Sequence, residues 1–232
     1  MKARALLEHL EELRKRFLVV TGFFFISFAL GVMISPWIIK KISADLIITG
    51  VSLVSLSPLE FIYTQLKVGF VFALAISFPV LVYELIRFIR PALKKKELIA
   101  LKYIMPGFLM FFVFGVLFAY FVFLKPALFF LAGLSTLARI ENLWSIHYFI
   151  SFILWICFSL GLVFELPLLL LLLKKLNLIT RSFLRKYRPH IYVLAFVIAA
   201  IITPPDVITQ IIIALPLVIL FEISYWLMAI IK

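Results

Sequence analysis

Cysteine, histidine and charged side chains are scarce in this 232-residue chain. Lys, Arg, Asp and Glu make up only 15% of the residues, whereas soluble domains hold about 25%, so a soluble globular protein is excluded. The single cysteine, Cys157, excludes an intrachain disulfide and a cysteine metal cluster. The three histidines, His9, His147 and His190, belong to segments at different depths, so we expect no metal site.

Short enzyme motifs are missing as well. The sequence contains no HExxH, no GxSxG and no glycine-rich phosphate loop, which are motifs of metal-assisted hydrolysis, acyl transfer and phosphate binding. We therefore expect no catalytic residue, no cofactor and no enzyme activity. The net charge of +12 would favour a nucleic-acid ligand in a soluble protein, but here it has to be interpreted by position, and we expect no nucleic acid to bind.

Apolar residues are what the chain has in excess. They account for 66% of the sequence, which includes 26 Phe, and the mean hydropathy is +1.22. Six apolar runs are candidates to cross a bilayer, which takes about 20 residues each time. They cover residues 17–39, 68–86, 104–124, 146–173, 191–203 and 207–231. We predict one all-α polytopic membrane domain, residues 1–232, with six transmembrane helices surrounded by lipid.

Lys and Arg are distributed unevenly between the two sets of connections. If the N-terminus is inside, the inner segments hold 18 of the 23 basic residues and the outer segments hold five. Basic residues accumulate on the cytoplasmic side of membrane proteins. The bias predicts that both termini are cytoplasmic.

The two outer connections, residues 36–67 and 126–145, are themselves apolar. We expect them to pack as a cap over the outer ends of the helices, although segments lying flat on the lipid would have the same composition. The last two helices are predicted to be short, because the fifth apolar run has only 13 residues and the sixth is interrupted by Glu222. Arg188 and Glu222 are equally far from Pro205, so we expect an ion pair between them.

The N-terminal segment predicts a short amphipathic helix over residues 2–16. Leu6, Leu10 and Leu13 form an apolar stripe with acidic residues opposite. One interpretation is a surface anchor stabilised by pairs such as Glu12 with Arg16 at i,i+4. The alternative is a site for a cationic partner, above all a guanidinium group that a carboxylate holds with two parallel hydrogen bonds.

Two further acidic residues precede or lie in the first inner connection. Glu97 is surrounded by basic residues, and the simplest interpretation is neutralisation by neighbouring lysines. Pro91 is expected to end the second helix, because its ring disfavours helical geometry in the preceding residue. Glu84 lies three residues before Arg87, a spacing that predicts an ion pair.

One carboxylate, Glu165, falls deep inside an apolar run. It lies two residues before Pro167, which removes a backbone donor and should kink the fourth helix. An ionisable group in this place is costly, so we expect it to face a polar cavity or a partner, with a protonated carboxyl bonded to a neighbouring helix as the alternative. In the last outer turn, Asp206 is expected to cap the sixth helix.

Four segments together resemble the TatC family, the signal-recognising core of the twin-arginine translocase. They are the HLEELRKR stretch that begins at His9, the FIRPAL stretch with the following Glu97, the FELP stretch around Glu165, and the TPPD turn with Gln210. The motifs occur in order along essentially the whole chain. Arg90 and the lysine run that crowd Glu97 depart from the family pattern.

The resemblance implies a receptor, in the cytoplasmic (inner) membrane, for folded proteins that carry twin-arginine signal peptides. It implies partners similar to the small single-span TatA and TatB proteins, self-association in a larger complex, and transport driven by the proton-motive force. By the same resemblance, the signal peptide would bind at Glu12, Glu97, Arg14, Phe88 and Pro91, an intramembrane polar site for partners would comprise Glu165 and Pro167, and the outer turn would comprise Pro204, Pro205, Asp206 and Gln210.

Two other functions compete with the receptor. One is an ion-coupled solute transporter in which Glu165 carries a proton or cation at a broken helix. Against it, the sequence has no matching pair of interrupted helices in two symmetric halves. The other is a structural scaffold for further membrane subunits.

Overall fold

The computed structural model describes residues 2–89, 95–137, 141–176, 178–203 and 207–230. Within these ranges, side chains are described for residues 10–88, 106–135, 141–176, 178–203 and 207–228. The described chain is almost entirely helical and contains the elements α1 (Lys2–Leu46), β1 (Val51–Val54), α2 (Glu60–Ile89), α3 (Lys95–Phe118), the π-helical segment η2 (Ala119–Phe123), α4 (Leu124–Leu137), β2 (Asn142–Ser145), α5 (Ile146–Val163), α6 (Leu166–Lys175), α7 (Arg181–Ile202) and α8 (Val207–Ile230).

The six predicted apolar runs lie in helices, with a break between Val163 and Leu166 in the fourth, and the all-α polytopic membrane fold is confirmed. Five helical stretches are long and apolar enough to cross a bilayer, namely Leu10–Leu46, Glu60–Phe88, Pro106–Ser135, Ile146–Lys175 and Val207–Met228. The fifth predicted run belongs to α7, whose first part is basic and whose second part is apolar, and which is not among these five stretches. α7 and α8 have 22 and 24 residues, so they are shorter than α1 and α2, but α8 is as long as α3 and contains a candidate span of 22 residues. The helix α8 continues past Glu222 to Ile230.

The N-terminal segment is not a separate short helix. Residues 2–16, predicted as an amphipathic helix, are the first part of the 45-residue helix α1. The apolar stripe of this segment continues into the apolar run that begins at Phe17. Residues 6–21 contain neither glycine nor proline, so no residue at the junction ends the helix.

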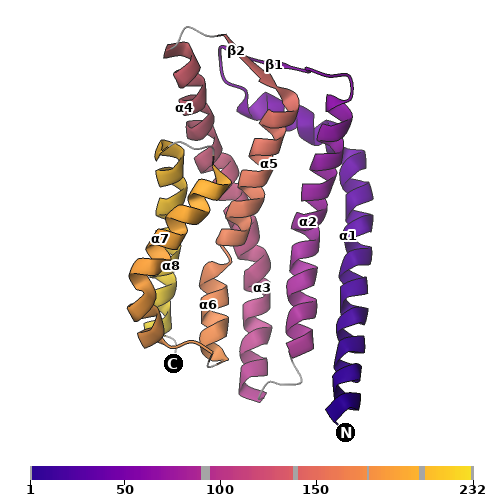
Figure 1. Cartoon of the computed structure of the whole chain (residues 1–232), viewed down its shortest axis with the longest axis vertical. Coiled ribbons are helices and arrows are strands. Elements are labelled where there is room, and N and C mark those ends of the chain that lie inside the picture. The colour runs from indigo at the N-terminus through magenta and orange to yellow at the C-terminus, as the bar shows by residue number, and fades with distance from the viewer. Residues whose placement is uncertain (1, 90–94, 138–140, 177, 204–206, 231–232) are drawn as a thin grey trace.

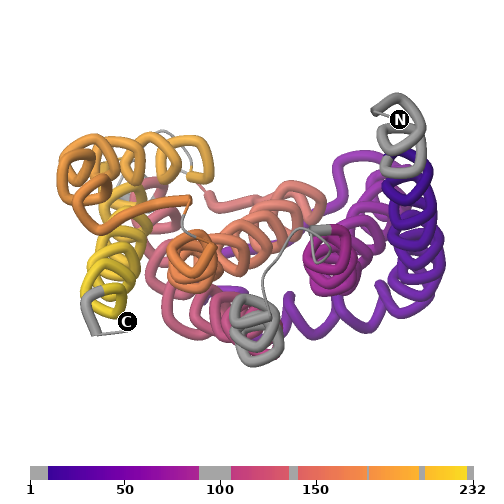
Figure 2. Tube along the Cα trace, turned by 90° about the horizontal axis from the view of Figure 1, so that it is seen from below, coloured from indigo at the N-terminus to yellow at the C-terminus, as the bar shows by residue number. Residues whose placement is uncertain are grey.

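The helices stand side by side in an elongated assembly (Figure 1). Viewed along the helices, α1 lies at one edge and α7 and α8 at the other, with α5 and α3 between them (Figure 2). Both chain termini lie at one end of the assembly, which we call the terminal end, and β1 and β2 lie at the opposite end, which we call the cap end (Figure 1).

Glycines allow the closest helix crossings. A Cβ atom added to Gly31 of α1 would lie 2.9 Å from the Cα of Gly69 of α2, and one added to Gly115 of α3 would lie 2.7 Å from the carbonyl oxygen of Leu160 of α5. In membrane proteins, such small residues bring backbones together where lipid provides no hydrophobic drive for association. The buried core is centred on α5, where Ile150, Ile153, Ile156 and Leu160 are almost completely inaccessible.

The apolar connection after the third run is largely helical. Residues 126–137, predicted as part of an outer loop, belong to α4, which continues α3 through the π-helical turn η2. Pro126 does not end the helix, because the wider turn just before it shifts the hydrogen-bond pattern, and Leu124 donates to the carbonyl of Ala119 instead. The cap is therefore built from fewer residues of this connection than the sequence predicts.

The two predicted outer segments do meet as a cap. β1 and β2 pair in parallel, with Val51 opposite Asn142 and Val54 opposite Ser145. Leu53 of β1 and Trp144 of β2 pack against the core of the helices.

Glu60 joins this cap to the helices below it. Its Oε1 accepts hydrogen bonds from the Ser145 hydroxyl and from the backbone N–H of His147 at 3.2 Å. Its Oε2 accepts from the backbone N–H groups of Leu56 and of Ser57, the latter at 3.3 Å. One carboxylate therefore holds the N-terminal ends of α2 and α5 together.

Candidate functional site

The first candidate site lies near the terminal end, where α1 and α2 are joined by charged side chains. Arg16 donates through Nη2 to Glu12 Oε1, which confirms the predicted i,i+4 pair. It also donates through Nη1 to Glu84 Oε2 at 2.9 Å, across 68 residues of sequence. We call Glu12, Arg16 and Glu84 the Arg16 cluster.

The structure confirms the predicted pair of Glu84 with Arg87 and adds a closer partner, Arg16. Arg87 is close to Glu84 at 3.9 Å, but its side chain is 57% exposed. The Arg16 guanidinium is nearer and only 15% exposed. Water screens an ion pair whose partner is largely exposed, so such a pair contributes less to stability than a close, partly buried pair. Arg16 is therefore the principal partner of Glu84.

The two carboxylates of the Arg16 cluster differ in accessibility. The side chain of Glu84 is 11% exposed and that of Glu12 is 36% exposed. A cation arriving from the aqueous side at the terminal end therefore reaches Glu12 first. The Arg16 cluster also shows that these carboxylates can bind a guanidinium group, because they already hold that of Arg16.

Of the other residues predicted for this site, two are described in full. Arg14 is exposed on α1, and Phe88 lies in the last turn of α2, four residues after Glu84 and hence on the same face of that helix. Pro91 lies outside the described residues. The backbone of Glu97 belongs to the first turn of α3, which begins at the terminal end (Figure 1), while its side chain lies outside the described part.

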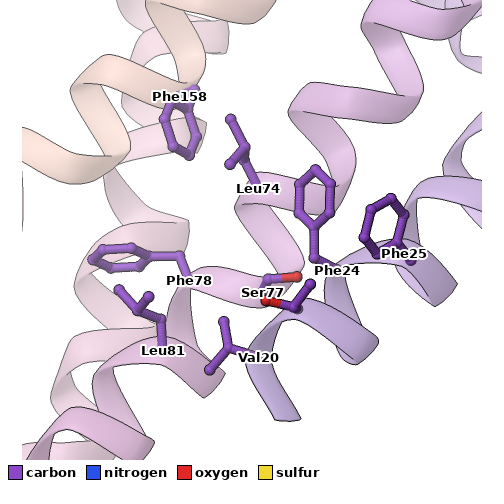
Figure 3. Close-up of a pocket in the computed structure, with 9 residues that line it drawn as sticks. Val20, Phe24, Phe25, Leu74, Ser77, Phe78, Leu81 and Phe158 are labelled. Carbon is purple, nitrogen blue, oxygen red and sulfur yellow. The ribbon is translucent and has the colours of Figure 1, made fainter. Parts of the chain in front are cut away.

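An apolar groove begins one helical turn from the Arg16 cluster. It has a volume of about 310 Å³ and is lined by Val20, Thr21, Phe24, Phe25, Leu74, Ser77, Phe78, Leu81 and Phe158. In Figure 3, side chains of α1 face those of α2 across the groove, and Phe158 of α5 lies next to Leu74. The arrangement therefore places carboxylates beside an elongated apolar surface.

The second candidate site is Glu165, which lies at a break in the fourth span. α5 ends at Val163 and α6 begins at Leu166, with Pro167 in its first turn. The predicted kink is thus an interruption of the helix, since Pro167 has no N–H to continue the hydrogen-bond pattern.

The carboxyl of Glu165 is buried. The residue is 5% exposed, and neither of its side-chain oxygens has a hydrogen bond of ordinary geometry within the described part of the chain. Both oxygens are inaccessible, so a partner group can reach them only if the surrounding helices separate. A buried carboxyl without a donor is costly in any protein and more so in lipid.

The last two helices are linked at several levels. Arg188 Nε donates to Glu222 Oε1 at 2.7 Å, which confirms the predicted ion pair between α7 and α8. In the first turn of α8, Gln210 Nε2 donates to the carbonyl of Phe196 at 3.1 Å. Pro204, Pro205 and Asp206 of the predicted turn lie outside the described residues.

Comparisons with known proteins place the chain in a family. Residues 8–216 match the family model described as Sec-independent protein translocase protein (TatC). The TatC protein of Aquifex aeolicus is 36% identical over 225 residues, 96% of this chain and 93% of that protein. TatCd of Bacillus subtilis is 34% identical over 233 residues, 98% of this chain and 93% of that protein.

A solved structure agrees in fold. The crystal structure described as twin arginine translocase receptor TatC superposes with a TM-score of 0.85 at 36% identity, and covers 96% of this chain and 98% of that one. This chain belongs to the TatC family.

Membership of the TatC family makes the chain a component of a protein translocase and a multi-pass membrane protein. The match extends over nearly all of the chain and gives no support to the alternative of an ion-coupled solute transporter.

Glu60 is the residue of this TatC family chain that sequence reasoning missed. A usable signal was present, because Ser57 and Glu60 have the spacing of a capping box, in which the glutamate side chain accepts from the backbone N–H of the capping residue. The hydrogen bond from Ser57 to Glu60 has this form. The links from Glu60 to Ser145 and His147 had no signal in the sequence, because they depend on how two distant segments pack.

Proposed function

We propose that this TatC family protein is the receptor that binds twin-arginine signal peptides of folded proteins at its terminal end. The observation that carries the proposal is the Arg16 cluster, in which two carboxylates already hold a guanidinium group and Glu12 is open to the aqueous side. Carboxylates bind guanidinium with two parallel hydrogen bonds, a geometry that the compact ammonium group of lysine does not match.

In this proposal, Glu12 and Glu97 each hold one of the two arginines. Phe88 and Pro91 border the site, and Arg14 is assigned to it because it lies in the same HLEELRKR stretch as Glu12. A signal peptide continues from its basic part into an apolar stretch of about 7–15 residues. The groove between α1 and α2 begins one helical turn beyond Arg16 and Glu84 and offers that stretch an apolar surface.

The proposed orientation puts the terminal end in the cytoplasm and the cap end outside, in the cytoplasmic (inner) membrane. It is supported by the 18 basic residues in segments assigned to the inside, against five outside. The arginine site then faces the compartment in which the folded proteins are made.

Further proposed partners are small single-span proteins of the TatA and TatB kind and further copies of this chain, with the proton-motive force driving transport. Glu165, beside Pro167, is the proposed point where a partner helix or the inserted signal supplies the donor that the buried carboxyl lacks. Gln210, Pro204, Pro205 and Asp206, the residues of the turn predicted from the sequence, are proposed to connect the last two helices beside the partner helices.

The proposal is tested by capture of the purified protein on immobilised signal peptides. A peptide with paired arginines should retain the protein, and the same peptide with paired lysines should retain much less of it. Equal retention by both peptides would contradict a receptor that recognises guanidinium groups.

A further inference from the structure

The Arg16 guanidinium is shared between two carboxylates. Its Nη2 donates to Glu12, its Nη1 donates to Glu84 at 2.9 Å, and its Nε is buried without an acceptor within the described residues. With 15% of the side chain exposed, water can replace a lost carboxylate only in part. A mostly buried charge that loses its partner is strongly destabilising.

Signal-peptide binding therefore creates a competition at Glu12. An arginine that binds a carboxylate with two parallel hydrogen bonds uses both carboxylate oxygens. One of the Glu12 oxygens already accepts from Arg16. The incoming arginine can take both oxygens only if the Arg16 Nη2 leaves.

The position of Glu84 lowers the free-energy cost of releasing Arg16 from Glu12. It lies on α2, opposite Glu12 across Arg16, and its 11% exposed side chain is shielded from an incoming peptide. Its other basic neighbour, Arg87, lies 3.9 Å away and is mostly exposed, so it competes weakly with Arg16. When Arg16 is released from Glu12, Glu84 remains as its acceptor.

We infer that Glu84 is a positioning residue of the arginine site: it retains Arg16 while Glu12 is handed over to the signal peptide. This inference rests on the proposed function. Glu84 does not touch the peptide, and its effect passes through Arg16 alone.

The handover also contributes to specificity. A lysine binds as a compact charge and needs one carboxylate oxygen rather than two. An arginine gains its second hydrogen bond only after Arg16 has moved to Glu84. Loss of Glu84 should therefore weaken binding of a paired-arginine peptide more than binding of a paired-lysine peptide.

The test is a double-mutant cycle in the full-length protein, with the affinity for a labelled paired-arginine peptide as the measurement. Glu84→Gln keeps the side-chain shape and removes its charge, and we expect affinity to fall about tenfold, within the usual range for coupled neighbours. Arg16→Met removes the charge that needs a partner, so this variant should bind at least as tightly as the unmodified protein. The double variant should also bind that tightly, because no buried guanidinium remains.

Arg87→Gln is the matched control. It removes the other basic neighbour of Glu84 but leaves Arg16 in place, so we expect unchanged affinity. A purely structural role of Glu84 predicts no rescue by Arg16→Met, and an equal loss from Glu84→Gln in both backgrounds would overturn the inference. If Glu84→Gln does not fold, the affinity of Arg16→Met alone tests the inference. Weaker binding of the paired-arginine peptide by Arg16→Met would then overturn the inference.

Glu12→Gln separates this inference from the proposed function. Unchanged affinity in Glu12→Gln would overturn the proposed arginine site and the handover together. A loss in Glu12→Gln with unchanged affinity in Glu84→Gln overturns the handover and leaves the receptor proposal standing.

Discussion

The crossing of α3 and α5 at Gly115 should not tolerate a side chain. A Cβ atom at Gly115 would lie 2.7 Å from the carbonyl oxygen of Leu160, 2.8 Å from the Cβ of Phe164 and 2.9 Å from the Cα of Gly161. Ordinary van der Waals contact begins at 3.4 Å. The atoms in the way belong to the backbone or lie next to it, so no side-chain rotation relieves the overlap.

The whole of α5 must therefore move away from α3 in the variant Gly115→Ala. Overpacking of this kind costs about 1–3 kcal/mol of unfolding free energy. The same movement would loosen the wall around the neighbouring Glu165, because Phe164 packs directly against Gly115. We expect Gly115→Ala to lower the thermal unfolding temperature of the purified protein in detergent.

Gly22 provides the matched control. It lies in α1 with no atom within 4 Å of an added Cβ, so Gly22→Ala gains helix propensity, worth up to about 1 kcal/mol, without a clash. This variant should unfold at the same temperature as the unmodified protein or at a higher one. If Gly115→Ala and Gly22→Ala unfold at the same temperature, the close packing of α3 on α5 is wrong.

Three further predictions concern the cap, the orientation and the buried carboxyl. Glu60→Gln replaces two acceptor oxygens by one and should speed amide hydrogen exchange in β1 and β2, measured by mass spectrometry, and unchanged exchange would show that Glu60 does not hold the cap. In a variant without Cys157, a cysteine at Ser55 should react with an impermeant reagent added outside and a cysteine at Lys95 should not, and the reverse pattern would overturn the orientation. Glu165→Gln keeps the size and hydrogen-bonding capacity of the side chain, so it should retain more transport and partner crosslinking than Glu165→Ala. Normal transport by the Ala variant would make Glu165 a structural residue.

The helices and three ion pairs, Glu12–Arg16, Glu84–Arg87 and Arg188–Glu222, could be predicted because their signals are local. Apolar runs of bilayer length identify the crossing segments, and the four-residue spacing of Glu12 and Arg16 places them on one helix face. Arg188 and Glu222 could be paired because α7 and α8 follow each other closely in the sequence, and both residues lie 17 positions from Pro205.

Contacts between segments that are distant in sequence could not be predicted in this way. Glu84 has a basic neighbour three residues away, and nothing in the sequence reports that α1 brings Arg16 closer. The continuity of α3 and α4 was missed for a different reason. Pro126 normally signals a helix end, and the π-helical turn that accommodates it has no recognisable pattern in the sequence.

The central claim is that carboxylates at the terminal end recognise paired arginines, and binding titrations with Glu12 and Glu97 replaced by Gln test it most directly. Each replacement should cost about 1.5–3 kcal/mol of binding free energy for a paired-arginine peptide, the worth of a hydrogen bond to a charged group. The double variant should bind paired-arginine and paired-lysine peptides with similar, low affinity. A double variant that still prefers the paired-arginine peptide as strongly as the unmodified protein would contradict the account.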